Sequence, residues 1–221
     1  MSTVGDAHAH TLRLTVPQFG QWRLDAVLEG GEAPAEGSVV SAIVGDDLSL
    51  TGRVLRSGLD APDRPHVVVV GGLGWEAPLT APVSYQSDAS IMLSTVLDDL
   101  ARRASETVER PMDVPLGLAY ASAARRTIRD ALNALVLSGY MPMWRVDPDG
   151  VTRFGARVGT TIATRATVIR RNLGVSLRVV GIDSPASFLP GNTLVDGETN
   201  VPITRVIIDE ATNRLEAEVW S

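Results

Sequence analysis

The chain has 221 residues, of which 44% are hydrophobic and 21% are charged, a balance typical of a folded globular protein rather than a disordered tail. It contains no cysteine, which excludes disulfides, thiolate catalysis and cysteine-bound zinc or iron–sulfur clusters. All 20 basic residues are arginine, so Schiff-base lysine chemistry and the phosphate-binding lysine of P-loops are excluded as well. The formal net charge of −6 argues against a simple nucleic-acid binder.

The N-terminal third of the chain predicts β-structure. Residues 1–10 are small and polar, which predicts a frayed terminus without a signal sequence, and we expect a soluble protein made in the cytoplasm. Apolar residues then alternate over residues 11–28, and two further β runs at residues 39–44 and 48–55 flank the turn residues Gly45-Asp46-Asp47. Residues 67–70 are four valines, apolar on both faces, which predicts a strand in the centre of its sheet.

A glycine-rich segment follows these valines. Gly71–Ala77 contains the pattern G-x-G-x-x-A directly after a strand, which is the spacing of dinucleotide-binding loops. That function needs a helix N-terminus to hold the phosphates, and Pro78 and Pro82 argue against a helix in register. We therefore favour a simple connection, and keep a small nucleotide-binding enzyme that uses the Gly71–Gly74 loop as the alternative from another class.

The middle of the chain predicts two helices and a hairpin. Residues 91–104 and 121–138 carry apolar side chains at helical spacing, with cap residues before the first helix and Gly139 after the second. Trp144–Phe154 predicts a β-hairpin, because Pro148 and Asp149-Gly150 are turn residues between two alternating runs. Asp147 and Asp149 also resemble the start of a calcium loop, but Pro148 and the lack of a closing glutamate favour the hairpin.

From Thr161 the β pattern returns, and it ends in a terminal hairpin made of residues 203–208 and 215–219. The predicted fold class is α+β, mostly β. We expect an N-terminal β-barrel part at residues 11–86, a two-helix insert at 87–140 and a C-terminal β part at 141–221 that closes the barrel or barrels.

No catalytic constellation is evident, so we predict no enzyme activity, no cofactor and no metal site. His8 and His10 could clamp a metal ion, but they lie in the predicted frayed terminus with the third histidine, His66, far away in the sequence. Exposed tryptophan is favoured at protein interfaces, and Trp75 and Trp220 are therefore interface candidates, with local packing as the alternative.

The order of these features resembles the hub proteins of phage tails, namely the late-control D family, the central baseplate hub of contractile phages and the related type VI secretion spike proteins. The resemblance rests on a G-D-x-x-x-x-G-x-V element at Gly45–Val54, a D-L-A segment at Asp99–Ala101 in the first helix, the W-x-V-x-x-D-G hairpin at Trp144–Gly150 and the late turn Pro190-Gly191. It implies a fold of tail-tube-like β-barrels with a two-helix insert. It also implies a non-enzymatic ring, usually a homotrimer, at the distal end of the tail tube.

The resemblance further implies contact with the tail tube protein, the tape-measure protein and spike or fibre proteins, and a location in the virion tail after assembly in the host cytoplasm. The same soluble, cysteine-free, β-rich profile also fits a tail-completion or head–tail joining protein, which is the nearest alternative.

The first 50 residues carry a local charge that bears on such a ring. They hold seven acidic residues against two arginines, a net charge of −5. In a ring these acids would form a negative collar that lets DNA pass without specific binding. The channel-lining candidates are the four that flank predicted strands: Asp25, Glu29, Asp46 and Asp47.

Overall fold

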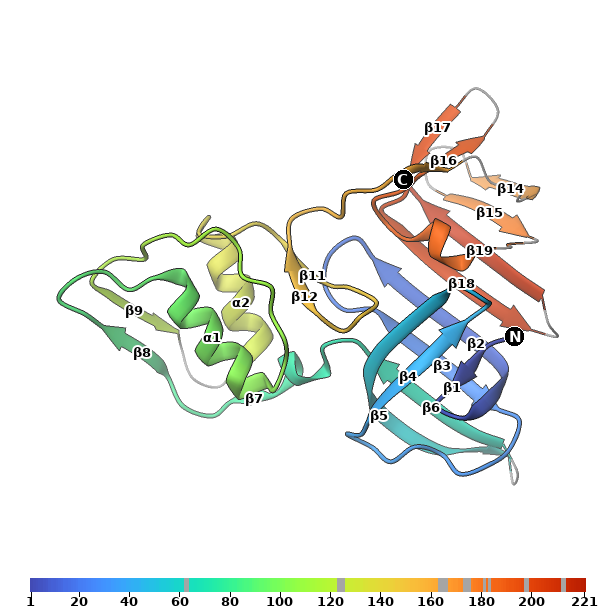
Figure 1. Ribbon diagram of the computed structural model, residues 1–221, viewed down its shortest axis with the longest axis horizontal. Helices are drawn as coiled ribbons and strands as arrows, with labels where there is room; N and C mark the ends of the chain where they lie inside the picture. Colours follow the sequence, from blue (N-terminus) through green and yellow to red (C-terminus); the bar gives the residue numbers. More distant parts are fainter. Residues whose placement is uncertain are drawn as a thin grey trace. The chain divides into compact units, whose positions relative to one another are not determined.

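The computed structural model describes residues 1–61, 64–122, 126–162, 167–172, 176–180, 182, 184–196, 199–211 and 214–221. The chain forms two compact units, one made of Met1–Gly71 with Ala156–Ser221 and the other of Gly72–Gly155 (Figure 1). The inserted unit therefore begins before the predicted boundary at residue 87, and it includes the hairpin that we had assigned to the C-terminal part.

Six strands close a barrel in the first unit: β1 (Thr3–Val4), β2 (Ala7–Pro17), β3 (Arg23–Leu28), β4 (Val39–Val44), β5 (Leu48–Ala61) and β6 (Arg64–Val70). Their order is β1-β4-β5-β6-β3-β2, and the pairing of β1 with β2 completes the antiparallel barrel. The alternating apolar residues of the sequence fill its interior, with Leu14, Leu24 and Leu28 fully buried. The fold class predicted from the sequence, mostly β with a barrel and two helices, is confirmed.

The predicted frayed N-terminus is wrong. Ser2 is fully buried, where its hydroxyl accepts the N–H of Gly45 at 2.9 Å and donates to the carboxylate of Glu210. Gly45 and Glu210 are distant from Ser2 in the sequence, so these contacts leave no local pattern. The sequence therefore predicts an unstructured terminus for a small polar segment that in fact closes the barrel.

The C-terminal strands extend the barrel wall. β18 (Arg205–Ala211) pairs with β2, and β19 (Arg214–Trp220), β15 (Ser176–Val180) and β14 (Thr167–Asn172) follow in that order. The predicted terminal hairpin is thus present as β18–β19, with Ile208 opposite both Leu14 and Ala217. β13 (Thr161–Ile162), β16 (Thr193–Asp196) and β17 (Thr199–Pro202) form a separate sheet, and the 3₁₀ turn η2 (Pro185–Phe188) lies between β15 and β16 in the chain.

The inserted unit holds both helices. Its elements are η1 (Leu73–Glu76), β7 (Pro78–Leu79), β8 (Val83–Gln86), α1 (Leu93–Ala104), β9 (Ala119–Ser122), β10 (Arg126–Thr127), α2 (Ile128–Leu137), β11 (Trp144–Val146) and β12 (Thr152–Phe154). β11 and β12 form the predicted hairpin, and β8 pairs with β9. In the described part of the chain, none of the helices is long and apolar enough to cross a membrane.

The start predicted for the second helix, near Ala121, is wrong. Residues 119–122 form β9, in which Tyr120 lies opposite Tyr85 of β8. The helix begins only after Thr127, whose side chain and backbone form a capping box with Asp130. A cross-strand pairing partner about 35 residues away therefore outweighs the local helix propensity of the alanines.

Candidate functional site

The glycine-rich loop serves packing. A Cβ added to Gly74 would lie 1.8 Å from the carbonyl oxygen of Ala104, so only glycine lets η1 approach the end of α1 this closely. The Gly74 N–H donates to Glu106 Oε1 at 2.7 Å, and the N–H groups of Trp75 and Ala77 bond to carbonyls within the loop. These amides are the groups that would have to hold a phosphate, and η1 spans four residues. The glycine-rich pattern that suggested nucleotide binding is therefore explained by packing and by hydrogen bonds within the protein.

Trp75 lies in the core of the inserted unit. Its side chain is fully buried and donates its Nε1–H to Thr152 Oγ1 at 2.9 Å. The ring centroid lies 6.5 Å from that of Trp144, with the planes tilted by 53°. The expected interface role for Trp75 is therefore corrected to local packing, because the glycine-rich loop turns this side chain into the core of the unit.

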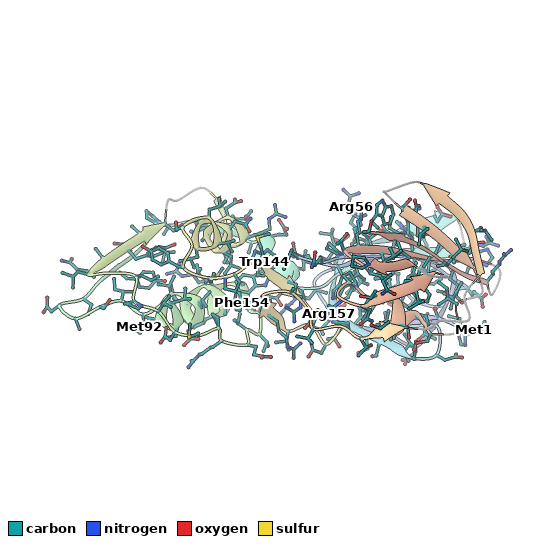
Figure 2. All side chains as sticks on the ribbon, turned by 90° about the horizontal axis from the view of Figure 1, so that it is seen from above. Met1, Arg56, Met92, Trp144, Phe154 and Arg157 are labelled. Atoms are coloured by element: carbon teal, nitrogen blue, oxygen red, sulfur yellow. The ribbon has the colours of Figure 1, made fainter. Side chains whose placement is uncertain are left out.

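Trp144 anchors the hairpin from the other side. It is 4% exposed and donates its Nε1–H to Asn133 Oδ1 of α2 at 2.9 Å. In the hairpin register it lies opposite Phe154 (both are labelled in Figure 2). Trp144 therefore points from β11 into the core of this unit.

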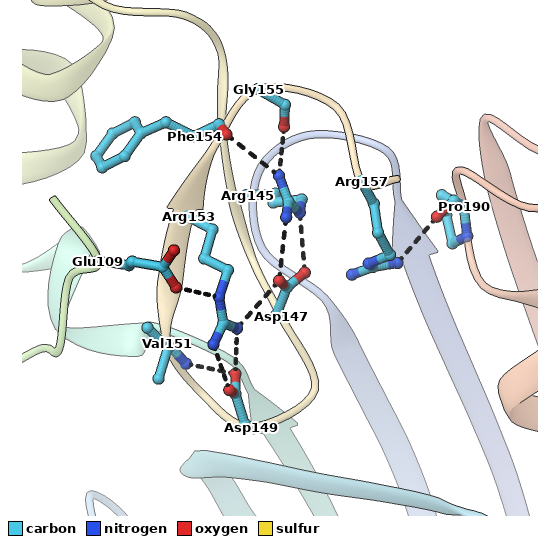
Figure 3. A network of polar contacts seen from close by, with 10 residues as sticks. All are labelled: Glu109, Arg145, Asp147, Asp149, Val151, Arg153, Phe154, Gly155, Arg157 and Pro190. Atoms are coloured by element: carbon cyan, nitrogen blue, oxygen red, sulfur yellow. Dashed lines mark hydrogen bonds and ion pairs between the residues drawn. The ribbon is translucent and has the colours of Figure 1, made fainter. Parts of the chain in front are cut away.

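An arginine–aspartate network surrounds the hairpin turn (Figure 3). Arg145 and Asp147 form a buried ion pair, with Nε–Oδ1 at 2.9 Å and Nη2–Oδ2 at 3.2 Å. Arg153 reaches Glu109 through Nε at 2.7 Å, Asp147 through Nη1 at 3.1 Å, and both oxygens of Asp149 at 2.9 and 2.8 Å. The calcium-loop resemblance of this segment fails, because arginines occupy the carboxylates that a cation would need.

Electrostatics in the network favour the charged forms. Burial alone would raise the pKa of Asp149, but the hydrogen bonds from Arg153 and from the Val151 N–H outweigh it and lower that pKa. The hydrogen bond to Asp149 raises the pKa of Arg153 in turn. Both shifts stabilise the charged forms of Asp149 and Arg153, as expected for an ion pair that holds the turn.

The first unit presents a polar sheet face, which we define by side chains that lie opposite one another on neighbouring strands. Asp25 of β3, Arg13 of β2, Asp209 of β18 and Glu216 of β19 follow one another in register. Arg13 lies 3.7 Å from Asp209, and Arg23 holds both oxygens of Asp25 at 2.8 Å. A groove of about 350 Å³ runs over this face, and its lining includes Arg13, Asp25, His66 and Asp209.

The four channel-lining candidates do not gather on this face. Asp25 lies on it, and Glu29 is exposed just after β3. Asp46 and Asp47 lie in the β4–β5 turn, where Asp46 is 3.6 Å from the N-terminal ammonium. Asp47 accepts from the Ser184 hydroxyl and, at 3.3 Å, from the Ala186 N–H, so it binds the start of η2. The acids that join Asp25 on the sheet face come from β18 and β19, and only the long-range register reveals them.

Trp220 is partly exposed near the end of β19. The guanidinium carbon of Arg205 lies 5.0 Å from its ring centroid, a cation–π distance, and the Thr204 hydroxyl donates to its carbonyl oxygen at 3.1 Å. A rigid, partly exposed tryptophan beside an arginine has the composition of an interface hot spot.

His8 and His10 are both exposed on the same face of β2. Within the residues that the structure describes, no group of three or more His, Asp or Glu side chains could hold a metal ion.

Comparison with solved structures identifies proteins of the same fold. The E. coli c3393 protein, a type VI secretion component described as structurally similar to the T4 tail proteins gp27 and gp5, has a TM-score of 0.67 and 15% identity over 100% of this chain and 74% of that one. The 43 kDa tail protein of prophage MuSo2 from Shewanella oneidensis has a TM-score of 0.67 and 10% identity over 100% and 96% of the two chains. A tail protein from Neisseria meningitidis MC58 has a TM-score of 0.64 and 11% identity over 100% and 95%.

No family model and no curated protein sequence matches this chain. At 10–15% identity the structural likeness establishes the fold. The resemblance to tail hub proteins that the sequence motifs indicated is thus confirmed at the level of the fold.

Proposed function

We propose that this chain is a structural protein of a phage tail, a hub that forms a ring at the distal end of the tail tube and links the tube to the tail tip or spike. The observation that carries the proposal is the match along the whole chain: the barrel, its extended sheet and the inserted helical unit together have the fold of three tail or secretion-apparatus proteins. The close packing of the glycine loop and the ion pairs of the hairpin network support a structural role rather than an enzymatic one.

The ring is proposed to be a homotrimer that contacts the tail tube protein, the tape-measure protein and spike or fibre proteins. Its test is the native mass of the purified chain, together with imaging of assembled tails labelled on this chain. We expect a three-fold or six-fold arrangement at the end of the tail away from the head. Only two-fold dimers in the particle would contradict the ring, and label at the head–tail junction would favour a head–tail joining protein.

We further propose that DNA passes through the ring along the polar sheet face. Asp25 lies there beside Arg13, with Asp209 and Glu216 on the neighbouring strands. Arg13 pairs with Asp209, and Arg23 pairs with Asp25, so carboxylates neutralise these arginines. A passing polyanion such as DNA would therefore not bind to this face. Glu29, Asp46 and Asp47 remain candidates for the same channel.

A structure of the assembled ring tests this lining directly. We expect Asp25 and Asp209 to face the axis. Outward-facing carboxylates at these positions would contradict the channel proposal while leaving the hub proposal intact.

A further inference from the structure

The hairpin turn contains a chemically labile dipeptide, Asp149-Gly150. In such a pair the backbone nitrogen of the glycine can attack the side-chain carboxyl carbon of the aspartate. A C–N bond forms, water leaves, and a five-membered succinimide results. Water then reopens the ring, mostly at the other carbonyl, and the product is isoaspartate, in which the backbone runs through the side chain and is longer by one methylene. Glycine favours the reaction because it has no side chain to hinder the attacking nitrogen.

The structure holds every group that this reaction uses. Asp149 Oδ1 accepts from the Val151 N–H at 3.1 Å and from Arg153 Nη1 at 2.9 Å, while Oδ2 accepts from Arg153 Nη2 at 2.8 Å. The attacking group, the Gly150 N–H, donates to the carbonyl oxygen of Asp147 at 2.9 Å. The reaction needs a neutral carboxyl, whose hydroxyl leaves as water, and a nitrogen free to lose its proton.

Arg153 is itself held in place. Its Nε–H donates to Glu109 at 2.7 Å and its Nη1 group also reaches Asp147 at 3.1 Å, so the guanidinium has acidic partners on three sides (Figure 3). Its side chain is 28% exposed, whereas that of Asp149 is 52% exposed. Water can therefore reach the aspartate, and the contacts of Arg153 rather than burial restrain it.

We propose that Asp149 is a latent site of isoaspartate formation and that Arg153 is the positioning residue that suppresses the reaction by clamping the carboxylate in its ionised form. Isomerisation would lengthen the turn between β11 and β12 and break the bond from Asp147 N–H to the Val151 carbonyl, which measures 3.0 Å. Thr152, the hydrogen-bond acceptor of Trp75, follows directly. The clamp thus protects the link between the turn and the tryptophan core.

The test is peptide mapping by mass spectrometry after incubation of the full folded chain for several weeks at neutral pH. The fraction of isoaspartate is measured at Asp149 and, as an internal reference, at Asp196, the aspartate of the second Asp-Gly pair in the sequence. In Arg153→Gln we expect the rate at Asp149 to rise several-fold, because the loss of the bidentate contact raises the pKa of the carboxyl and with it the protonated fraction that reacts. The rate at Asp196 should stay constant.

Glu109→Gln is the matched control, because it removes the charge of one partner of Arg153 but keeps the bidentate contact of Arg153 with Asp149. The rate of isoaspartate formation in this variant should stay close to that of the wild type. An unchanged rate at Asp149 in folded Arg153→Gln would overturn the proposal. Should that variant fail to fold, the proposal is tested by comparing the rate at Asp149 in the folded wild type with the rate in a synthetic peptide of residues 144–154. Isomerisation of the folded chain as fast as that of the peptide would also overturn the clamp.

Discussion

Single side chains of the inserted unit show what a local pattern can and cannot reveal. The burial of Trp144 follows from alternation in a hairpin whose turn residues are plain in the sequence. The burial of Trp75 does not, because a glycine-rich loop has no periodicity and its packing depends on α1 and β12.

Trp144→Ala should lower the free energy of unfolding by about 3–5 kcal/mol, since it removes a buried indole, its contact with Trp75 and the hydrogen bond to Asn133. Leu137→Ala is the control, because Leu137 is 88% exposed in the same unit and should change stability by less than about 0.5 kcal/mol. Urea unfolding of both variants measures the difference, and equal midpoints would contradict the assignment of Trp144 to the core.

The inserted unit should also lose stability in acid through Asp99. Burial alone would raise the pKa of this carboxyl, but hydrogen bonds from Tyr85, Arg103 and Arg102 outweigh it and lower the pKa. A lowered pKa in the folded state means that the stabilisation is complete above the unfolded value of about 3.9 and is lost as the pH falls through the folded value.

The urea midpoint, followed by tryptophan fluorescence, should therefore fall steeply below about pH 4. Asp99→Asn should start lower at neutral pH and fall less, whereas Asp88→Asn, at an exposed position, should behave like the wild type. If the urea midpoint fell equally with pH in all three proteins, Asp99 would not be the cause of the loss of stability in acid.

At the scale of elements, strong local signals predicted most of the structure. The first helix lies within two residues of its expected start, and the strands, the Trp144–Phe154 hairpin and the terminal hairpin are where alternation placed them. The errors share one physical cause. β1 pairs with the neighbouring β2 but closes the barrel through the distant strand β4, and β9, which replaces the first turns of the expected second helix, pairs with the distant strand β8.

The contact between η1 and α1 gives the sharpest test at this scale. Gly74→Ala should destabilise the chain by about 1–3 kcal/mol or more, because the new methyl group would overlap the Ala104 carbonyl and force two backbones apart. Gly58→Ala is the matched control, since nothing lies within 4 Å of the Cβ it would add. Melting curves that coincide for the two variants would contradict this account of the loop.

The same loop should not bind a nucleotide. The N–H groups of Gly74, Trp75 and Ala77 already have partners, and Pro78 lies in β7 rather than in a helix that could hold a phosphate. Titrations of NAD, FAD and ATP, followed by tryptophan fluorescence, should show no saturable change; binding in the micromolar range would restore the nucleotide-binding alternative.

At the scale of the whole molecule, the sequence predicted the class of fold and the helical insert, but not how the barrel joins the C-terminal strands. That junction is a single strand: β2 pairs with β1 through Ala7 and His8 and with β18 through residues 11–17. Ser2 and Glu210, 208 positions apart, meet beside it. The same pairing of β2 with β18 brings Asp209 beside Arg13 and so forms the polar sheet face. Local charge does not reveal this pairing, and Glu29, Asp46 and Asp47, which were chosen from local charge, lie elsewhere.

The proposed ring leads to a prediction for Trp220, the interface candidate that remains. Trp220 is partly exposed and its ring lies beside Arg205, and tryptophan and arginine are both enriched among the residues that dominate binding at interfaces. If Trp220 packs against a neighbouring copy, Trp220→Ala should weaken self-association by about 30-fold, which corresponds to roughly 2 kcal/mol. Because Trp220 is only partly buried in the separated chain, Trp220→Ala should lower the free energy of unfolding less than Trp144→Ala does. Sedimentation over a range of concentrations measures the association, and Leu59→Ala, at 70% exposure on β5, controls for the loss of an ordinary surface side chain. An association constant that Trp220→Ala leaves unchanged would remove Trp220 from the interface and direct the search for ring contacts to other surfaces of the first unit.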